Sequence, residues 1–168
     1  MTEDWFGVTG SGEVGDVAQE PMPLPAIPVS AGALIFDSAG RLLILKPTYK
    51  SGWTIPGGVM EADGESPWEA CQREVREETG LEVGRGRLAA MDFRPAKPGR
   101  LPGIRYLFDC GQVGDEALAD VKLQPEEISD SRLVSLTEAF TLLRGPISRR
   151  VQAATQGHFY LEDGRPAL

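Results

Sequence analysis

The spacing of apolar and polar residues predicts a β-hairpin near the start of the folded part of the chain. Residues 29–36 form a nearly continuous apolar run, which is typical of a buried strand. Residues 37–40 supply turn chemistry, and a second apolar run follows at residues 41–45. Together these runs predict two antiparallel strands joined by a short turn. Residues 53–55 predict a further short strand that ends at Pro56.

The second half of the chain predicts three more strands and two helices. The strands are expected at residues 88–93, 104–110 and 132–136, and the helices at residues 137–143 and 146–156. A Ser135-x-x-Glu138 box precedes the first of these helices, and Gly157 ends the second. No internal repeat is visible, so we expect an α+β domain with a mixed β-sheet between helices.

The helix expected over residues 66–79 has the most complete end signals. Ser66 suits the N-cap and Pro67 suits the first helical position. Glu69 completes a Ser-x-x-Glu capping box, and Gly80 stands where a left-handed C-cap belongs. These signals indicate a helix whose register can be trusted for placing side chains on its faces.

A helical wheel divides this helix into an apolar stripe and an acidic arc. Trp68, Cys71 and Thr79 fall within about 40° of Val75 at roughly 100° per residue, so this stripe should face the core. On the same wheel the three glutamates of the last turns lie at about −60°, −100° and −160°. They are Glu78, Glu74 and Glu77.

Three carboxylates on one arc repel one another and oppose the negative end of the helix dipole. One interpretation is a solvated acidic helix face, which is common in charge-rich helices. The other is a cation site, because oxygen ligands without His or Cys suit Mg²⁺ or Mn²⁺. Spacing alone does not decide between the two interpretations.

Composition limits the classes of function. The chain has 168 residues and a formal net charge of −8, which argues against broad nucleic-acid binding. Cys71 and Cys110 lack neighbours at zinc-ligand spacing, so two reduced thiols are expected. No apolar run reaches the ~18 residues of a membrane span. The first residues are acidic where a secretory signal would be basic, so we expect a cytoplasmic protein.

Composition and periodicity divide the chain into three parts. Residues 1–25 are rich in Gly, Pro and acidic residues and are expected to form a flexible N-terminal arm. Residues 26–157 should form the domain, and residues 158–168 a C-terminal tail. Three roles are open for this arm: it could cover a functional site, help a homodimer to form, or be an unstructured tail.

The residues around the acidic arc resemble the signature of the Nudix hydrolase family. The matching positions are Gly57-Gly58, Glu65, and the run Arg73-Glu74-Val75-Arg76-Glu77-Glu78-Thr79-Gly80-Leu81. The loop between Gly58 and Glu65 holds one residue more than the usual pattern, which leaves the helix register unchanged. The resemblance implies an α/β/α sandwich with a mixed sheet.

The resemblance also implies a chemistry. Metal ligands are expected at Glu74, Glu77, Glu78, Glu65 and Gly58, holding Mg²⁺ or Mn²⁺. Catalytic roles are expected at Glu77, Glu78 and Arg73, with Arg73 orienting the carboxylates. Glu127 lies just before a predicted strand and is a candidate general base, although an exposed acidic turn is the alternative.

Candidate substrate-binding residues are aromatic and basic. Trp53 and Phe93 could stack on a base, or could be core aromatics. Arg94 and Arg105 flank a Pro/Gly-rich loop and could hold a phosphate or terminal group, or could be solvated surface charges. The sequence does not rank substrates within the nucleotide class.

The leading hypothesis is a metal-dependent pyrophosphatase acting on a nucleoside diphosphate linked to another moiety. One alternative is a sanitising pyrophosphatase that acts on oxidised nucleoside triphosphates. Another is a non-catalytic Nudix module that senses a nucleotide. The intact glutamates favour an enzyme, and its partner is expected to be a small nucleotide derivative, without membrane attachment.

Overall fold

The computed structural model describes residues 26–168; the arm expected at residues 1–25 lies outside the described residues. The strands are β1 (Val29–Phe36), β2 (Leu42–Pro47), β3 (Gly57–Val59), β4 (Arg87–Arg94), β5 (Gly103–Gln112), β6 (Ile128–Val134), β7 (Tyr160–Glu162) and β8 (Arg165–Pro166). The helices are α1 (Pro67–Thr79), α2 (Asp115–Ala119), α3 (Leu136–Leu142) and α4 (Gly145–Thr155). Among the described residues, no helix is both long and apolar enough to span a bilayer.

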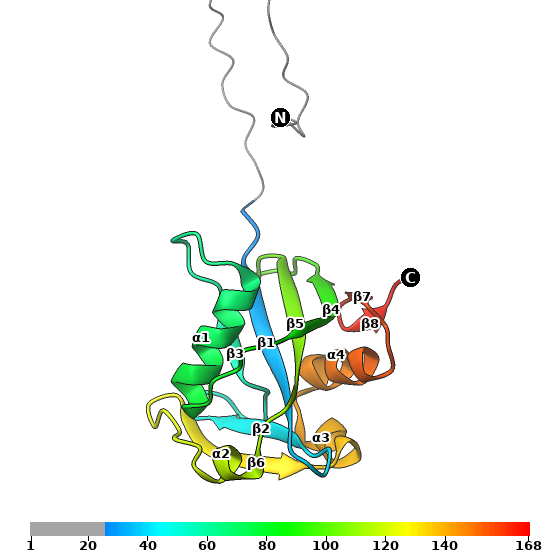
Figure 1. The fold of residues 1–168 in the computed structure, drawn as a ribbon. Helices are drawn as coiled ribbons and strands as arrows, with labels where there is room; N and C mark the ends of the chain where they lie inside the picture. The colour runs from blue at the N-terminus through cyan, green and yellow to red at the C-terminus, as the bar shows by residue number, and fades with distance from the viewer. Residues whose placement is uncertain (1–25) are drawn as a thin grey trace, which may run out of the picture.

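The strands form one mixed sheet between helices (Figure 1). Its order is β6-β2-β1-β5-β4-β7-β8, and β3 pairs with β1 outside this path. β1 runs parallel to β5 and antiparallel to β2 and β3. In Figure 1, α1 lies on one side of the sheet and α3 and α4 lie on the other. The predicted α/β/α sandwich with a mixed sheet is therefore confirmed.

Alternation along the central strands builds two apolar cores. Successive strand residues point to opposite faces, so Leu34 and Leu42 join one core while Ile35 and Leu43 join the other. The first core is covered by α3 and α4, and the second by α1. All four side chains are at most 2% exposed. Burial on both faces explains why the strands lack a polar side in the sequence.

Helix α1 begins and ends as its sequence predicts. The Ser66 hydroxyl accepts a hydrogen bond from the Glu69 N–H at 3.3 Å, and the Ser66 N–H donates to the Glu69 carboxylate at 2.8 Å. Gly80 has a φ of 71°, in the left-handed region. The predicted apolar stripe faces the core, because Cys71 and Val75 are fully buried.

The C-terminal residues differ from the expected tail. β7 pairs in parallel with β4, and β8 pairs with β7. Leu161 of β7 is fully buried in the core beneath α3 and α4. The sheet therefore continues past residue 157. The short strand predicted at residues 53–55 is present only as isolated bridges of Trp53 and Thr54, and β3 begins after it at Gly57. The sequence did not predict α2, because an element of five residues is too short to display a period.

Candidate active site

Exposure of the three glutamates follows their angles on the helical wheel. Glu78, nearest to the apolar stripe, is 4% exposed. The Glu74 side chain is 13% exposed and the Glu77 side chain is 48% exposed. The acidic arc therefore runs from the core outward, and it is not a uniformly solvated face.

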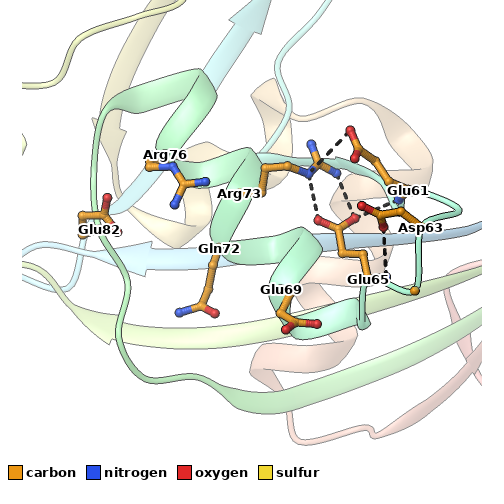
Figure 2. Close-up of a pocket in the computed structure, with 9 residues that line it drawn as sticks. Glu61, Asp63, Glu65, Glu69, Gln72, Arg73, Arg76 and Glu82 are labelled. Carbon is orange, nitrogen blue, oxygen red and sulfur yellow. Dashed lines mark hydrogen bonds and ion pairs between the residues drawn. The ribbon is translucent and has the colours of Figure 1, made fainter.

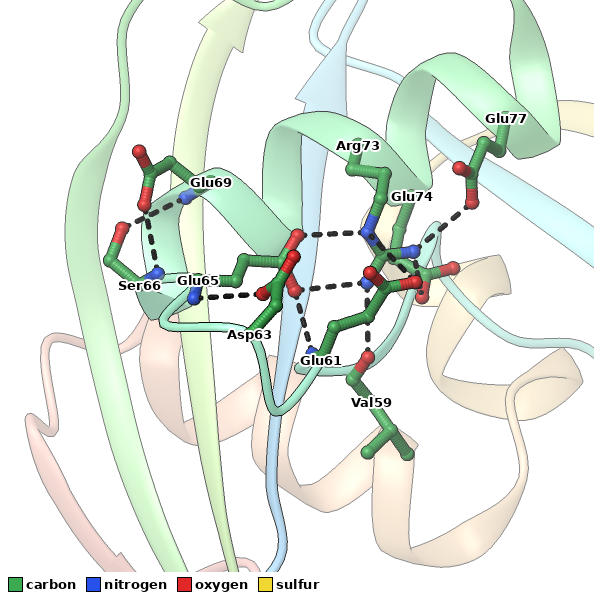
Figure 3. Close-up of polar contacts among 9 residues, drawn as sticks. All are labelled: Val59, Glu61, Asp63, Glu65, Ser66, Glu69, Arg73, Glu74 and Glu77. Atoms are coloured by element: carbon green, nitrogen blue, oxygen red, sulfur yellow. Dashed lines mark hydrogen bonds and ion pairs between the residues drawn. The ribbon is translucent and has the colours of Figure 1, made fainter.

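Arg73 donates hydrogen bonds to four groups around the arc (Figure 3). Its Nε donates to Glu65 Oε1 at 2.8 Å, and its Nη1 donates to Glu74 Oε1 at 2.9 Å and to Glu77 Oε2 at 3.1 Å. Its Nη2 donates to the Val59 carbonyl at 3.1 Å and to Glu65 Oε2 at 3.1 Å. The bond with Glu65 is the main cause that raises the pKa of Arg73 and lowers that of Glu65. Glu74 and Glu77 share one nitrogen, so their carboxylates lie side by side.

The double-glycine strand β3 packs directly on the glutamates. The Gly57 N–H donates to Glu78 Oε2 at 2.8 Å, which fixes the buried carboxylate. Gly58 lies against Glu74 so closely that a Cβ there would be 2.3 Å from Glu74 Oε1. Only a glycine leaves room for this carboxylate beside the backbone.

Burial and neighbouring charges act on Glu78 together. Burial is the main cause that raises its pKa to about 8; the Gly57 hydrogen bond opposes this shift, and the charges of Glu74, Glu127 and Glu77 contribute to it. The charge of Glu127 also raises the pKa of Glu74. A hydrogen bond fixes the backbone of Glu127, because its carbonyl accepts from the Thr48 N–H at 2.8 Å. The structure thus brings this late residue to the glutamates of α1.

The donor set fits a hard divalent cation. Carboxylates of α1, Glu65, Glu127 and the backbone at Gly58 supply oxygen only, which suits Mg²⁺ or Mn²⁺. Within residues 26–168 no three His, Cys, Asp or Glu side chains are arranged to hold a metal ion, and Arg73 forms ion pairs with Glu65, Glu74 and Glu77. The net negative charge and the glycine cradle around Glu74 are the observations that favour a cation.

A cavity of about 420 Å³ adjoins the buried end of the arc. Gly57, Gly58 and Glu78 border it on one side. Tyr49 also lines it and is 62% exposed, with Lys50 Nζ 4.8 Å from the centre of its ring. An exposed aromatic ring beside a cavity offers a surface on which a nucleobase can stack.

A second hollow, of about 540 Å³, lies on the outer side of α1 (Figure 2). Its lining residues include Glu61, Asp63, Glu69 and Glu82, which are acidic and face solvent. Glu65 and Arg73 border it, but Glu78 and the double glycine do not. The cavity of about 420 Å³ is therefore the candidate substrate site, although the hollow on the outer side of α1 has the larger volume.

The candidate substrate-binding residues separate into two groups. Arg94 and Arg105 line the cavity beside Glu78. Trp53 does not: it is 8% exposed within the core, with the Arg132 guanidinium 4.6 Å from its ring centre. Phe93 is not among the lining residues either. Trp53 has no free face for a base, so its expected stacking role does not fit its position.

Several cavity residues were not singled out from the sequence. Tyr49 lies in the turn after β2, and Arg144 and Arg150 lie at the start of α4 and within it. None belongs to a local motif, so no sequence signal identified them. A useful signal would have been an aromatic residue in the turn that follows the apolar run of β2.

The protein is thus an α/β/α sandwich in which a glutamate-rich helix packs on a double-glycine strand. The chain belongs to the Nudix family, because the family model of the NUDIX domain matches residues 26–154. The resemblance inferred from residues 57–81 is confirmed.

Individual relatives agree with this assignment. A MutT-like protein from Streptomyces ambofaciens is 31% identical over 118 residues, covering 67% of this chain and 73% of that protein. An RNA pyrophosphohydrolase from Pseudomonas aeruginosa is 36% identical over 61 residues, covering 36% of this chain and 38% of that protein. The crystal structure of the MutT protein from Methanosarcina mazei Go1 has a TM-score of 0.66 at 29% identity, covering 77% of this chain and 94% of that one.

Proposed function

We propose that the chain is a divalent-metal-dependent hydrolase that cleaves the phosphoanhydride bond of a nucleoside diphosphate linked to another moiety. The observation that carries this proposal is that buried Glu78 and the Gly57-Gly58 strand border a cavity of about 420 Å³. That volume is in the usual range for small-molecule sites. Addition of water would release a nucleoside monophosphate and a phosphorylated partner.

The glutamates of α1 and Gly58 are the groups that would hold the cation. A bound Mg²⁺ or Mn²⁺ supplies positive charge that neutralises phosphate oxygens and activates water. Glu74, Glu77 and Glu78 present their carboxylates from one helix, and the Gly58 backbone lies against them. Arg73 orients Glu74 and Glu77 through shared hydrogen bonds and ties Glu65 to the same cluster.

Glu127 is the proposed general base. Its charge raises the pKa of both Glu74 and Glu78, and this supports a role for Glu127 beside the cation site. Its backbone is fixed by Thr48, whereas its side chain is on an exposed turn and is free to reorient. An exposed carboxylate can take the water proton and release it to solvent.

Tyr49 is the proposed stacking residue, in place of Trp53. It lines the cavity and exposes most of its ring. A base stacked on Tyr49 would leave the diphosphate to lie along β3, where backbone groups of Gly57 and Gly58 are accessible to it. This arrangement also suits a nucleoside triphosphate, which is the second candidate substrate.

A hydrolysis screen tests the proposal. The full chain is incubated with Mg²⁺ or Mn²⁺ and nucleotide sugars, ADP-ribose, NADH, dinucleoside polyphosphates or oxidised nucleoside triphosphates, and products are separated by chromatography. We expect Glu77→Gln to lower kcat by about 10²-fold or more, since a ligand of the catalytic cation is lost. Its melting temperature without metal should stay the same or rise slightly, because a repelling charge is removed.

The matched control is Glu116→Gln, which makes the same change on the exposed helix α2 and should leave kcat unaltered. A chelator should abolish turnover by the wild type while the melting temperature persists, because both cores are apolar. Full activity of Glu77→Gln, or turnover that survives chelation, would refute the proposed function. Ligand-induced stabilisation with no product would support a sensing module instead.

A further inference from the structure

The cavity beside Glu78 has a basic side that cleavage of one phosphoanhydride bond does not require. Six cationic side chains line the cavity: Lys50, Arg94, Arg100, Arg105, Arg144 and Arg150. The carboxylates that line it are Glu78 and Asp163. This balance is opposite to that of the chain, whose net charge is −8. The five arginines are called the arginine wall below.

Separate elements contribute the arginine wall. Arg94 ends β4, Arg105 lies in β5, and Arg100 lies in the loop between these strands. Arg144 is the N-cap residue of α4, and Arg150 lies within that helix. The folded sheet and the helix on its face therefore bring together five guanidinium groups that are up to 56 positions apart in the chain.

Carboxylates neutralise little of this wall. Arg150 donates to Asp92 at 2.8 and 2.9 Å, and within residues 26–168 it is the one member of the wall with an ion pair. Asp163 lines the cavity, but its carboxylate lies 3.5 Å from Lys97 and 3.7 Å from Arg149, outside the wall. Arg94 and Arg105 donate to backbone carbonyls alone in the same part of the chain.

Buried donors of the wall also lack acceptors. Arg94 Nε, Arg100 Nε, Arg100 Nη2 and Arg144 Nε are inaccessible to solvent and make no hydrogen bond in the described part of the chain. Leaving a buried charged donor without a partner is costly, so such groups normally indicate a missing acceptor. An anion with several oxygens would satisfy donors from more than one arginine at once.

The start of α4 adds further positive potential. Arg144, Pro146 and Ile147 of this segment line the cavity. The helix has 11 residues, and no side chain caps its N-terminus. Free N–H groups and the positive end of the helix dipole favour an anion at such a position.

Crowding within the wall is consistent with an anion site. Burial is the main cause that lowers the pKa of Arg105 to about 10; the charges of Arg94 and Arg150 contribute to this shift, and that of Asp92 opposes it. Burial likewise lowers the pKa of Arg94, and Arg100 and Arg150 add to the effect. Cations are thus held close to one another with little opposing charge, and a bound anion would relieve that repulsion.

We propose that the arginine wall binds a second phosphate group of the substrate, one outside the phosphoanhydride bond that is cleaved. This inference rests on the proposed function, because it assigns Glu78 and the double glycine to the cation site and the arginine wall to the additional phosphate. Substrates whose remote moiety is a neutral sugar would leave the wall unfilled. The preferred class is therefore a nucleotide derivative with more phosphates than the two at the scissile bond.

Two pairs of substrates distinguish where this phosphate lies. NADH and NADPH differ by one phosphate monoester on a ribose, remote from the diphosphate. Diadenosine diphosphate and diadenosine tetraphosphate differ by two phosphates within the chain. We expect kcat/KM to be about 10- to 100-fold higher for the richer member of one pair, since each charged hydrogen bond contributes on that scale. The pair that shows the preference identifies the position of the phosphate.

The variants Arg100→Gln and Arg144→Gln should remove this preference mainly by raising KM for the richer substrate. Neither side chain makes a hydrogen bond within residues 26–168, so both variants should fold, as circular dichroism can verify. The control Arg85→Gln makes the same charge change on an exposed loop and should keep the preference. Equal kcat/KM in both pairs, or equal losses in Arg85→Gln, would overturn the inference.

A binding measurement separates this inference from the proposed function. Sodium tripolyphosphate, added with a chelator, should raise the melting temperature of the wild type and of Glu77→Gln. The double variant with both Arg100→Gln and Arg144→Gln should show no such rise. Absence of hydrolysis in every assay would contradict the proposed function alone, whereas absence of this stabilisation in the wild type would contradict the arginine wall as a phosphate site.

Discussion

Two adjacent glycines of β3 have different physical requirements. Gly57 has a φ of 140°, and a Cβ there would lie 2.2 Å from the Ala31 carbonyl oxygen, which belongs to a rigid strand. A Cβ at Gly58 would meet the far end of the flexible Glu74 side chain. Gly57 is therefore required by the sheet itself, whereas Gly58 is required by the position of one carboxylate.

Gly58→Ala should consequently impair the site and leave the fold nearly intact. The added methyl group displaces Glu74, so the Mg²⁺ concentration for half-maximal activity should rise by about 10- to 100-fold. The free energy of unfolding without metal should change by less than about 1 kcal/mol, because the side chain can rotate away. Metal titrations of activity and urea unfolding measure the two effects.

The control for this substitution is Gly84→Ala, where a Cβ would meet nothing within 4 Å. It should leave both the Mg²⁺ requirement and stability close to wild type. An unchanged Mg²⁺ requirement in Gly58→Ala would show that Glu74 has no part in holding the cation.

The β1–β2 hairpin is stabilised by one carboxylate in its turn. Asp37 is 1% exposed and accepts hydrogen bonds from the Ala39 N–H at 3.0 Å, the Arg41 N–H at 2.7 Å and Arg41 Nε at 2.6 Å. Burial raises the pKa of Asp37, but the hydrogen bonds and charge of Arg41, with the bond from Ala39, outweigh burial and lower it. The turn that closes the hairpin therefore depends on an ionised side chain.

This shift predicts an acid sensitivity at the level of the hairpin. The folded pKa lies below the unfolded value of about 4, so Asp37 stabilises the fold above that value and its contribution is lost as the pH falls below about 5. Asp37→Asn should be less stable at pH 7 but should lose less stability between pH 5 and pH 3. Urea midpoints across this range measure the difference.

Asp120→Asn, on an exposed residue after α2, serves as the comparison for the hairpin variant. Its pH profile should follow the wild type. Parallel curves for Asp37→Asn and the wild type would contradict the role assigned to this carboxylate.

The C-terminal strands complete the molecule on the α4 side of the sheet. Leu161 packs in the same core as Val151 of α4 and Leu107 of β5. The Gly164 N–H and Arg150 both donate to the buried Asp92 carboxylate, which connects the β7–β8 turn, α4 and β4. The last residues therefore help to fix the positions of β4 and α4, which carry part of the arginine wall.

Leu161→Ala should destabilise the whole domain. Removing a fully buried leucine leaves a cavity and costs about 2 to 5 kcal/mol in the free energy of unfolding. Leu168→Ala makes the same change on a side chain that is 97% exposed and should cost almost nothing. Urea unfolding of both variants tests whether residues 158–168 belong to the folded unit, and equal stability would show that they do not.

Local signals predicted most elements correctly. The caps of α1 and the apolar runs of β1 and β2 depend on residues close together in the chain, so the sequence displays them directly. The three-residue strands β3 and β7 carry no period and are recruited by pairing with distant strands. The sequence made Trp53 a candidate for substrate binding because the neighbouring residues of an aromatic side chain do not tell whether it lies in a core or in a binding site.

The sequence by itself determined the spacing of Glu74, Glu77 and Glu78, because a helix repeats every 3.6 residues and places them on one arc. It also determined that Gly57 and Gly58 precede that helix. Only the tertiary structure decided that Glu127 approaches the arc and that Tyr49 and Arg144 share its cavity. These residues are far apart in the chain. Strand order and helix packing bring them together, and no local pattern in the sequence encodes either.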